Sequence, residues 1–298
     1  MYKIQFLNGG LANQAFQYIF ARYYELSHPG GVMYMDDSYF ALNTVHNGYE
    51  LEKVFGIKPH MLSEVFDREM WQYILEERKN GKSIPQILLD NGNKIVMISD
   101  VKNSYAEFNP FEGEVFYTEK RGFTPKILDF PGNAYYHGYW ICKEWFDTYK
   151  DNFLREFTFP ELQDDVNKRR MNEILEKNSL AIHIRRGDYV ALDWALPIQH
   201  YKERLDMWTQ DMGMATDWDL YVFSDDIDWC KSNSEEMGFN VFRRVCYVEG
   251  NVGGKNYIDM QLMSQCKGVI ASNSAFSYLA ALLNTRKIGY IGPQDRDV

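Results

Sequence analysis

Residues 180–189 read Leu-Ala-Ile-His-Ile-Arg-Arg-Gly-Asp-Tyr, an apolar run that ends in two arginines and a glycine. The apolar part predicts a buried strand, and the polar residues after it predict a loop into the next element. From about residue 163 onward the same texture repeats. Strands are expected at 180–184, 220–223, 268–271 and 288–291, and helices at 164–177 with Asp164 as N-cap, 198–212, 257–266 and 275–284. This alternation predicts a parallel, doubly wound sheet.

The N-terminal half begins in a similar way. Residues 2–7 predict a short strand, Asn8-Gly-Gly10 predicts a turn, and apolar residues then recur at helical spacing from Leu11 to Leu26. Between residues 30 and 160 the pattern is irregular apart from a helix-like segment near 63–80. A chain of 298 residues is long enough for two domains of roughly 150 residues each. We therefore expect an α/β fold with domains at 1–160 and 161–298.

The composition restricts the class of ligand. Hydrophobic residues make up 45% of the chain and aromatic residues 16%, which is enough apolar material to exclude a disordered protein. The 32 Lys and Arg residues against 42 Asp and Glu give a formal charge of −10. Such a surface repels a phosphate backbone, so nucleic acid is not an expected partner. A polyanionic ligand would have to be held by a local cluster of positive charge.

Cysteine usage and hydropathy indicate the compartment. The four cysteines, at positions 142, 230, 246 and 266, have no CxxC spacing, which is typical of reduced thiols in a cytosol. The first residues lack the pattern of a signal peptide, and no run approaches the ~18 apolar residues of a membrane span. We expect a cytoplasmic protein, at most peripheral to a membrane.

Polar motifs follow three of the predicted strands, where ligands bind in doubly wound sheets. The first motif runs from His183 to Asp188, the second is Ser224-Asp-Asp226 and the third is Ser272-Asn-Ser274. Arginine presents a planar fork of donors that suits phosphate oxygens, and two adjacent arginines suit a diphosphate. Because side chains alternate along a strand, His183 and Arg185 would share one face. Arg186 would be either a contact from the loop or an anchor for Asp188; the alternative for the whole motif is a surface arginine pair with an internal salt bridge.

Two further motifs have a functional and a structural interpretation. The segment 272–277 lies where a strand turns into a helix, so its backbone N–H groups and hydroxyls could bind phosphate, or Ser272, Asn273 or Ser274 could simply cap the helix. Asp226-Ile-Asp228 matches the Asp-x-Asp pattern of metal-dependent sugar transferases, but an acidic cap with Asp228 opening a helix is the favoured interpretation. The histidines show no metal-ligand spacing, and we predict no metal site.

Taken together, these stretches resemble the α-1,2-fucosyltransferases of glycosyltransferase family 11. The resemblance is carried by residues 9–21, 181–189 and 270–281, in the family's order, and more weakly by 221–226 followed by Trp229. The chain departs from the family at Ala12, Ala15 and Ala275 and at Tyr278-Leu279. The missing hydroxyl at Ala275 removes one expected phosphate or cap contact.

The resemblance implies a fold of the GT-B type, with two Rossmann-like domains that face a cleft. Residues 1–160 would form the acceptor-side domain and residues 161–298 the GDP-fucose-binding domain. The implied reaction is an inverting transfer of L-fucose from GDP-β-L-fucose to the 2-hydroxyl of a terminal galactose, without a metal or any cofactor. A bacterial, cytosolic enzyme is expected on the same basis.

The resemblance also implies roles for single residues. Arg185 would bind the diphosphate with Arg186 nearby, His183 would contact the donor, and Asp259 would contact guanine or ribose. The phosphate cradle would be formed by Ser272, Asn273, Ser274 and Ser277. Asn13 and Gln14 would border the cleft. Asp188 is the first candidate for a general base, before Asp36, Asp37 and Glu25, and a mechanism with little base assistance stays open. The alternatives are a metal-dependent transferase of another nucleotide sugar that uses Asp226 and Asp228, and a non-catalytic glycan- or nucleotide-binding module.

Overall fold

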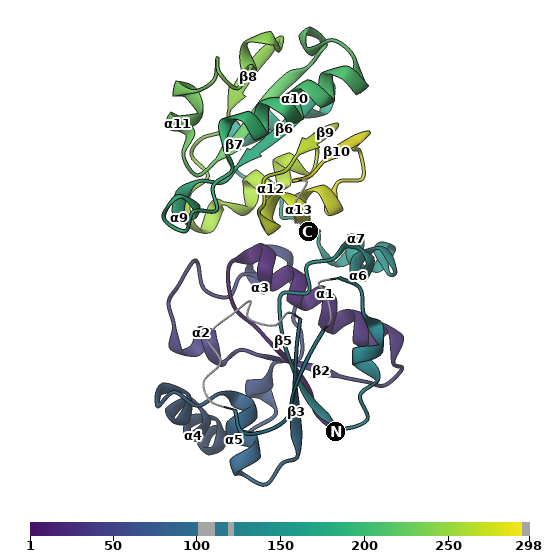
Figure 1. Ribbon diagram of the computed structural model, residues 1–298, viewed down its shortest axis with the longest axis vertical. Helices are drawn as coiled ribbons and strands as arrows, with labels where there is room; N and C mark the ends of the chain where they lie inside the picture. Colours follow the sequence, from purple (N-terminus) through teal and green to yellow (C-terminus); the bar gives the residue numbers. More distant parts are fainter. Residues whose placement is uncertain (101–110, 119–121, 294–298) are drawn as a thin grey trace. The chain divides into compact units, whose positions relative to one another are not determined.

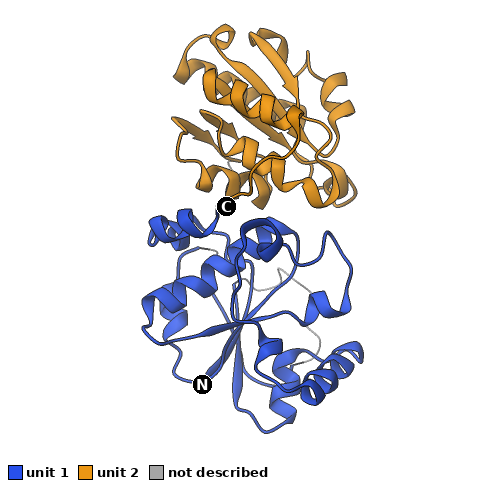
Figure 2. Ribbon diagram, turned by 180° about the vertical axis from the view of Figure 1, so that it is seen from behind, with its two compact units in different colours: residues 1–158, 297 blue, residues 159–296, 298 orange. Residues whose placement is uncertain are grey.

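The computed structural model describes residues 1–100, 111–118 and 122–293 (Figure 1). The chain divides into two compact units, of which the first spans Met1–Thr158 and the second begins at Phe159 (Figure 2). Within the described residues, each unit is an α/β structure built on a five-stranded sheet in which every pairing is parallel. The predicted fold class, two Rossmann-like α/β units, is confirmed. The acceptor and donor roles of the two halves remain predictions.

The sheet of the first unit has the strand order β2-β1-β5-β3-β4. Its strands are β1 (Lys3–Phe6), β2 (Met33–Asp36), β3 (Ile95–Ser99), β4 (Val115–Tyr117) and β5 (Asn133–His137). Its helices are α1 (Leu11–Ser27), α2 (Ser38–Leu42), α3 (Leu51–Phe55), α4 (Arg68–Lys79), α5 (Ile84–Asp90), α6 (Lys143–Asp147) and α7 (Lys150–Glu156), with short 3₁₀ turns η1 (Leu62–Glu64) and η2 (Pro125–Asp129). The predicted strand, glycine turn and helix at the N-terminus are confirmed.

Aromatic side chains fill much of the core of the first unit. Phe20 on α1 stacks on Trp140 with ring centroids 4.2 Å apart, and its edge meets Trp145 at 5.1 Å. Trp140 and Trp145 are almost completely buried. Packing therefore accounts for these aromatic residues, which need no ligand to explain them.

The sheet of the second unit has the order β10-β9-β6-β7-β8, with β6 in the centre. Its strands are β6 (Ser179–Ile184), β7 (Asp219–Ser224), β8 (Arg244–Tyr247), β9 (Gly268–Ile270) and β10 (Gly289–Ile291). Its helices are α8 (Asp165–Glu176), α9 (Gly187–Ala191), α10 (Ile198–Met212), α11 (Ile227–Ser232), α12 (Tyr257–Met263) and α13 (Ala275–Leu283), with 3₁₀ turns η3 (Ala215–Asp217), η4 (Phe239–Val241) and η5 (Gly253–Lys255). The central strand is buried along its whole length, as its apolar sequence predicts.

The boundaries of several elements test the sequence analysis. Asp164 caps α8 by accepting a hydrogen bond from the backbone N–H of Asn167 at 2.8 Å, as predicted. The helix expected at 63–80 begins later, at Arg68, because Asp67 caps it. The helix expected to reach residue 266 ends at Met263. The edge strand β8 was not predicted, because its sequence lacks a continuous apolar run. In the structure its residues are exposed or only partly buried.

The four cysteines are free thiols, as expected from their spacing. In the ranges that the structure describes, no helix combines the length and the apolar character required to cross a bilayer.

Close packing around Gly268 allows a stability test. A methyl group added at this position would overlap the ring of Trp208 and approach Leu180 Cδ1 to 2.8 Å. Gly268→Ala should therefore lower the free energy of unfolding by roughly 1–3 kcal/mol, the usual effect of overpacking. The control is Gly10→Ala, where no atom lies within 4 Å of the added methyl group. Urea denaturation measures both; equal stabilities of the two variants would contradict the packing described.

Candidate functional site

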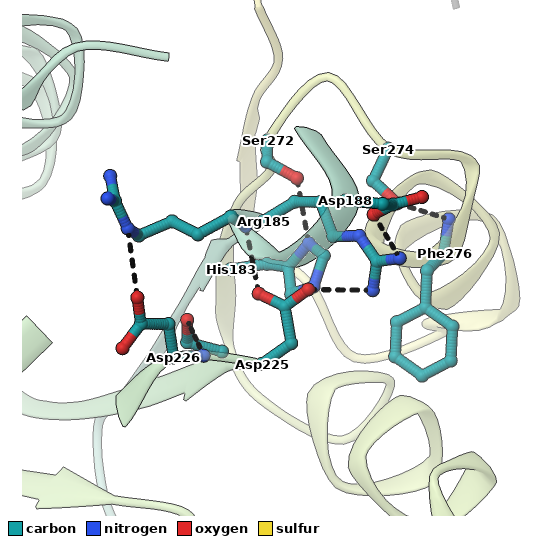
Figure 3. Close-up of polar contacts among 10 residues, drawn as sticks. His183, Arg185, Asp188, Asp225, Asp226, Ser272, Ser274 and Phe276 are labelled. Atoms are coloured by element: carbon teal, nitrogen blue, oxygen red, sulfur yellow. Dashed lines mark hydrogen bonds and ion pairs between the residues drawn. The ribbon is translucent and has the colours of Figure 1, made fainter. Parts of the chain in front are cut away.

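The ends of three neighbouring strands bring the sequence motifs of the second unit together. Strand β6 pairs in parallel with β7 on one side and with β9 on the other, so their carboxyl ends lie at the same edge of the sheet. The residues that follow are the arginine pair, the Asp225-Asp226 pair and the segment 271–274. Figure 3 shows the polar contacts among these side chains.

Arg185 is held by two carboxylates from different segments. Its Nη2 lies 2.7 Å from Asp188 Oδ1 and its Nη1 lies 2.9 Å from Asp225 Oδ2 (Figure 3). The Tyr189 ring lies 5.4 Å from the guanidinium carbon. One third of the side chain is still exposed, and the two ion pairs engage two of the five N–H donors of a guanidinium. Arg185 is therefore oriented in advance yet accessible to an anion.

Asp225 connects the two strand ends. Besides its ion pair with Arg185, it accepts a hydrogen bond from the backbone N–H of Arg186 at 2.8 Å. Gly187 allows this approach, because a Cβ there would lie 2.5 Å from Asp225 Oδ2. The sequence placed Asp225 in a strand-end motif but not among the site residues. Its partner lies 40 residues earlier in the chain, and no local pattern reveals such a pairing.

Arg186 has a different role from Arg185. Its Nε donates to Asp226 Oδ2 at 3.2 Å, and its guanidinium lies 3.8 Å from the centre of the Trp229 ring. Asp188 pairs with Arg185 instead, so the suggestion that Arg186 anchors Asp188 is wrong. A cation over a tryptophan face, with a carboxylate at its edge, fixes the loop between β6 and α9.

The Asp-x-Asp motif forms a helix start. Asp226 is the cap of α11, where its Oδ1 accepts a hydrogen bond from the backbone N–H of Trp229. Asp228 lies in the first turn of the helix and its side chain is almost fully exposed. The acidic-cap interpretation is confirmed: Asp226 is the cap, and Asp228 lies in the first turn of the helix. Across the described residues, no cluster of three potential ligands from His, Cys, Asp and Glu could hold a metal ion.

His183 is a buried, neutral group. Its Nδ1 lies 2.8 Å from Ser272 Oγ, and its ring lies 5.7 Å from that of Phe276. Burial lowers its pKa to about 3, and the positive charge of Arg185 adds to this shift. At neutral pH the imidazole is therefore uncharged. It can donate one hydrogen bond and accept another, but it cannot act as an acid.

The segment before α13 is fixed by hydrogen bonds of its own side chains. Ser274 caps the helix, with its Oγ accepting from the N–H of Phe276 at 3.3 Å. The hydroxyl of Ser277 is buried and donates to the carbonyl of Ser274, and Asn273 Nδ2 donates to the carbonyl of Trp194 at 2.8 Å. The capping alternative is confirmed for Ser274. These side chains fix the loop, and the phosphate cradle assigned to them remains a prediction that involves the backbone N–H groups.

Asp259 lies in another part of the second unit. Its Oδ1 accepts a hydrogen bond from Asn251 Nδ2 at 2.7 Å, and Asn251 in turn contacts Asn167 on α8. Burial raises the pKa of this carboxyl to about 7. Its hydrogen bond to Asn251 connects it to the loop before α12 and, through Asn167, to α8. Its role with guanine or ribose remains a prediction.

Asn13 and Gln14 belong to the first unit. Gln14 is completely buried, and its Nε2 donates to the carbonyls of Gly9 and Gly48, both at 2.9 Å. Its Oε1 accepts from the N–H of Glu50 at 2.8 Å. Gln14 therefore fixes the glycine turn after β1, whereas Asn13 is partly exposed. Their place beside the substrate remains a prediction.

The four carboxylates considered as a general base have different surroundings. Asp36 is completely buried and accepts a hydrogen bond from the Tyr135 hydroxyl, and burial raises the pKa of Asp37. Glu25 pairs with an arginine on its own helix. Asp188 is half exposed, but its charge is compensated by Arg185. To act as a base, Asp188 would have to leave this partner.

The fold, two α/β units each built on a parallel sheet, is of the GT-B type. The chain belongs to glycosyltransferase family 11, since the model of "Glycosyl transferase family 11" matches residues 5–297. The predicted family is thereby confirmed.

Relatives agree with this assignment. The chain is 28% identical over 290 residues to an Escherichia coli alpha-1,2-colitosyltransferase, covering 95% of this chain and 88% of that protein. It is 26% identical over 293 residues to the Escherichia coli O-antigen biosynthesis glycosyltransferase WbnK, covering 94% and 89%. Among solved structures, a mutant of Arabidopsis thaliana FUT1 in complex with GDP is similar with a TM-score of 0.55 at 13% identity, covering 99% of this chain and 71% of that one. This last likeness supports the fold alone.

The pKa of His183 gives a testable pH dependence. In the unfolded chain the imidazole takes up a proton near pH 6.5, whereas in the folded protein it does so only near pH 3. Between these two values only the unfolded chain binds the proton, so protonation favours unfolding. The free energy of unfolding is therefore unaffected by His183 above about pH 6.5 and falls below it, by at most about 1.4 kcal/mol per pH unit. His183→Gln should remove this part of the pH dependence. The free energy of unfolding between pH 7 and pH 4 measures it, and identical slopes for both proteins would contradict a neutral, buried His183.

Proposed function

We propose that this family 11 glycosyltransferase transfers L-fucose from GDP-β-L-fucose to the 2-hydroxyl of a terminal galactose, with inversion and without a metal ion or cofactor. The observation that carries the proposal is the pre-oriented, partly exposed Arg185 at the carboxyl end of β6. The proposed donor also agrees with the resemblance of three sequence blocks to the α-1,2-fucosyltransferases.

The reaction requires positive charge where GDP departs. When no cation is present, the charge that develops on the leaving diphosphate must be met by fixed donors. The guanidinium of Arg185 can donate two parallel hydrogen bonds to a phosphate group. To do so it gives up its ion pair with Asp188, its exposed partner, and binds phosphate oxygens instead. Asp225 keeps the guanidinium in place during this exchange because it is bound from the other side. Arg186 contributes by fixing the loop.

Two further groups complete the proposed donor site. Helix α13 begins just after the carboxyl end of β9, at the same sheet edge as the arginines, and helix N-termini favour negative charge. His183 lies next to this helix start through its contact with Ser272. Since the imidazole is neutral, it serves the donor as a hydrogen-bonding group rather than as a second positive charge. Asp259 is assigned to the guanine or ribose by the resemblance.

A second donor is favoured by one relative. The alpha-1,2-colitosyltransferase of Escherichia coli matches 95% of this chain. Its name shares the α-1,2 linkage with the proposed reaction but specifies a different sugar. A colitosyl donor is therefore the competing substrate, and the diphosphate chemistry described for Arg185 would be the same.

An acceptor-dependent release assay tests the proposal. GDP formation is measured from GDP-fucose, with GDP-mannose and a colitosyl nucleotide as comparisons, lactose as acceptor and EDTA throughout. We expect lactose-dependent release from GDP-fucose, inhibited by GDP and not by ADP. Preference for the colitosyl donor would replace the sugar in the proposal. Release only after Mn²⁺ is added would contradict metal independence and favour the alternative based on Asp226 and Asp228.

Substitution of Arg185 tests the proposed chemistry directly. Arg185→Ala should lower kcat by ~10²- to 10³-fold, the usual effect of removing one charge-stabilising donor. Arg185→Lys should recover only part of the rate, because an ammonium group cannot form the bidentate contact. Arg169→Ala, at an exposed position on α8, is the matched control. Activity of Arg185→Ala within a few-fold of the wild type would refute the assignment.

A further inference from the structure

Apolar side chains are exposed directly beside the proposed donor site. Val190, Leu192 and Trp194, on α9 and the turn after it, have exposed fractions of 51%, 50% and 47%. The same short segment carries Asp188, the partner of Arg185. A cluster of half-exposed apolar residues at the edge of a polar site indicates a binding surface.

The Trp194 ring is held in a fixed position although it is half exposed. It meets the ring of Tyr189 edge-on at 5.6 Å, and the Tyr189 ring faces Arg185. The Trp194 backbone N–H donates to the carbonyl of Tyr189 at 2.8 Å, and its own carbonyl accepts from Asn273 at 2.8 Å. Asp193 before it adopts a left-handed conformation with φ of 55°. A non-glycine residue in this conformation is uncommon and is held there by its surroundings.

The position of this ring points to the acceptor rather than to the nucleotide. Arg185 is assigned to the diphosphate, so the transferred sugar and the attacking hydroxyl must lie within a few bonds of it. Only Tyr189 separates Arg185 from Trp194 in the chain of contacts. A pyranoside has an apolar C–H face that packs on an aromatic ring, while its hydroxyls stay free to bind polar groups.

We propose that Trp194 is an acceptor-binding residue, whose indole packs against the terminal galactoside ring. This inference rests on the proposed function and adds a contact that positions the acceptor. Tyr189 and Asn273 are positioning residues that hold the indole. The hydrogen bond from Asn273 to the Trp194 carbonyl connects the proposed acceptor contact to the start of α13. The segment after β6 and the segment after β9 would therefore position both substrates.

The test separates acceptor binding from donor binding. Trp194→Ala should raise KM for lactose by about tenfold or more, as expected for the loss of one apolar contact in a specificity pocket. KM for GDP-fucose and the acceptor-independent release of GDP should stay within about twofold of the wild type on the same reasoning. Trp194→Phe keeps a ring against Tyr189, so its KM for lactose should lie between those of the wild type and Trp194→Ala. Val241→Ala, half exposed in the same unit, is the control.

Two kinetic outcomes would overturn the inference. An unchanged KM for lactose would show that the indole does not contact the acceptor. A parallel rise of both KM values would show that Trp194 acts on Arg185 through Tyr189. A shift in sedimentation coefficient on substitution would identify a second copy of the chain as the occupant of this surface, which would also overturn the proposal.

A binding measurement makes the test independent of turnover. Saturation-transfer NMR of lactose with the GDP-saturated protein should show contact in the wild type and a loss of contact in Trp194→Ala. If the wild type transfers no fucose but shows this Trp194-dependent contact, the proposed function fails and the acceptor site stands. If the wild type binds no galactoside in either assay, the acceptor site is refuted.

Discussion

The ion pair between Arg185 and Asp225 connects the ends of two adjacent parallel strands and sets the geometry of the site. Asp225 also binds the backbone of Arg186, so one carboxylate fixes both the guanidinium and the path of the chain. Gly187 leaves room for this carboxylate, since a Cβ there would lie 2.5 Å from Asp225 Oδ2 and the carboxylate would have to shift. These contacts also fix the position of the segment that carries Asp188. The accessible donors of Arg185 are therefore prepared before a ligand arrives, which is the condition for effective charge stabilisation.

Both arginines of the site are paired with carboxylates. The chain as a whole is acidic, with a formal charge of −10. Arg185 pairs with both Asp188 and Asp225, and Arg186 pairs with Asp226. His183 stays neutral because it is buried beside Arg185. In the proposed function, an entering polyanion replaces Asp188, the more exposed partner, rather than Asp225. The proposed exchange would let the site bind a diphosphate in a protein whose net charge is negative, and release it when Asp188 returns.

The sequence was informative where structure is determined locally. The apolar run of β6 predicted a buried central strand, and Asp164 predicted the start of α8 through a cap that involves only the next turn. Strand-end motifs predicted which loops would meet, since parallel strands share one edge. The sequence analysis offered an internal salt bridge of the arginine motif as an alternative, and Arg185 does pair with Asp188. The partners Asp225 and Asp226 were not predictable, because they come from a different strand. The alternation rule separated the two arginines correctly, but it could not show that Arg186 would lie on Trp229.

The central claim is that Arg185 binds the diphosphate without help from a metal ion. Its most direct test is calorimetric titration of GDP and GMP, in EDTA, into the wild type and Arg185→Ala. The account predicts that the wild type binds GDP much more tightly than GMP, because the second phosphate meets Arg185, and that the variant loses most of this difference. A preference for GDP that is as large in Arg185→Ala as in the wild type would contradict it.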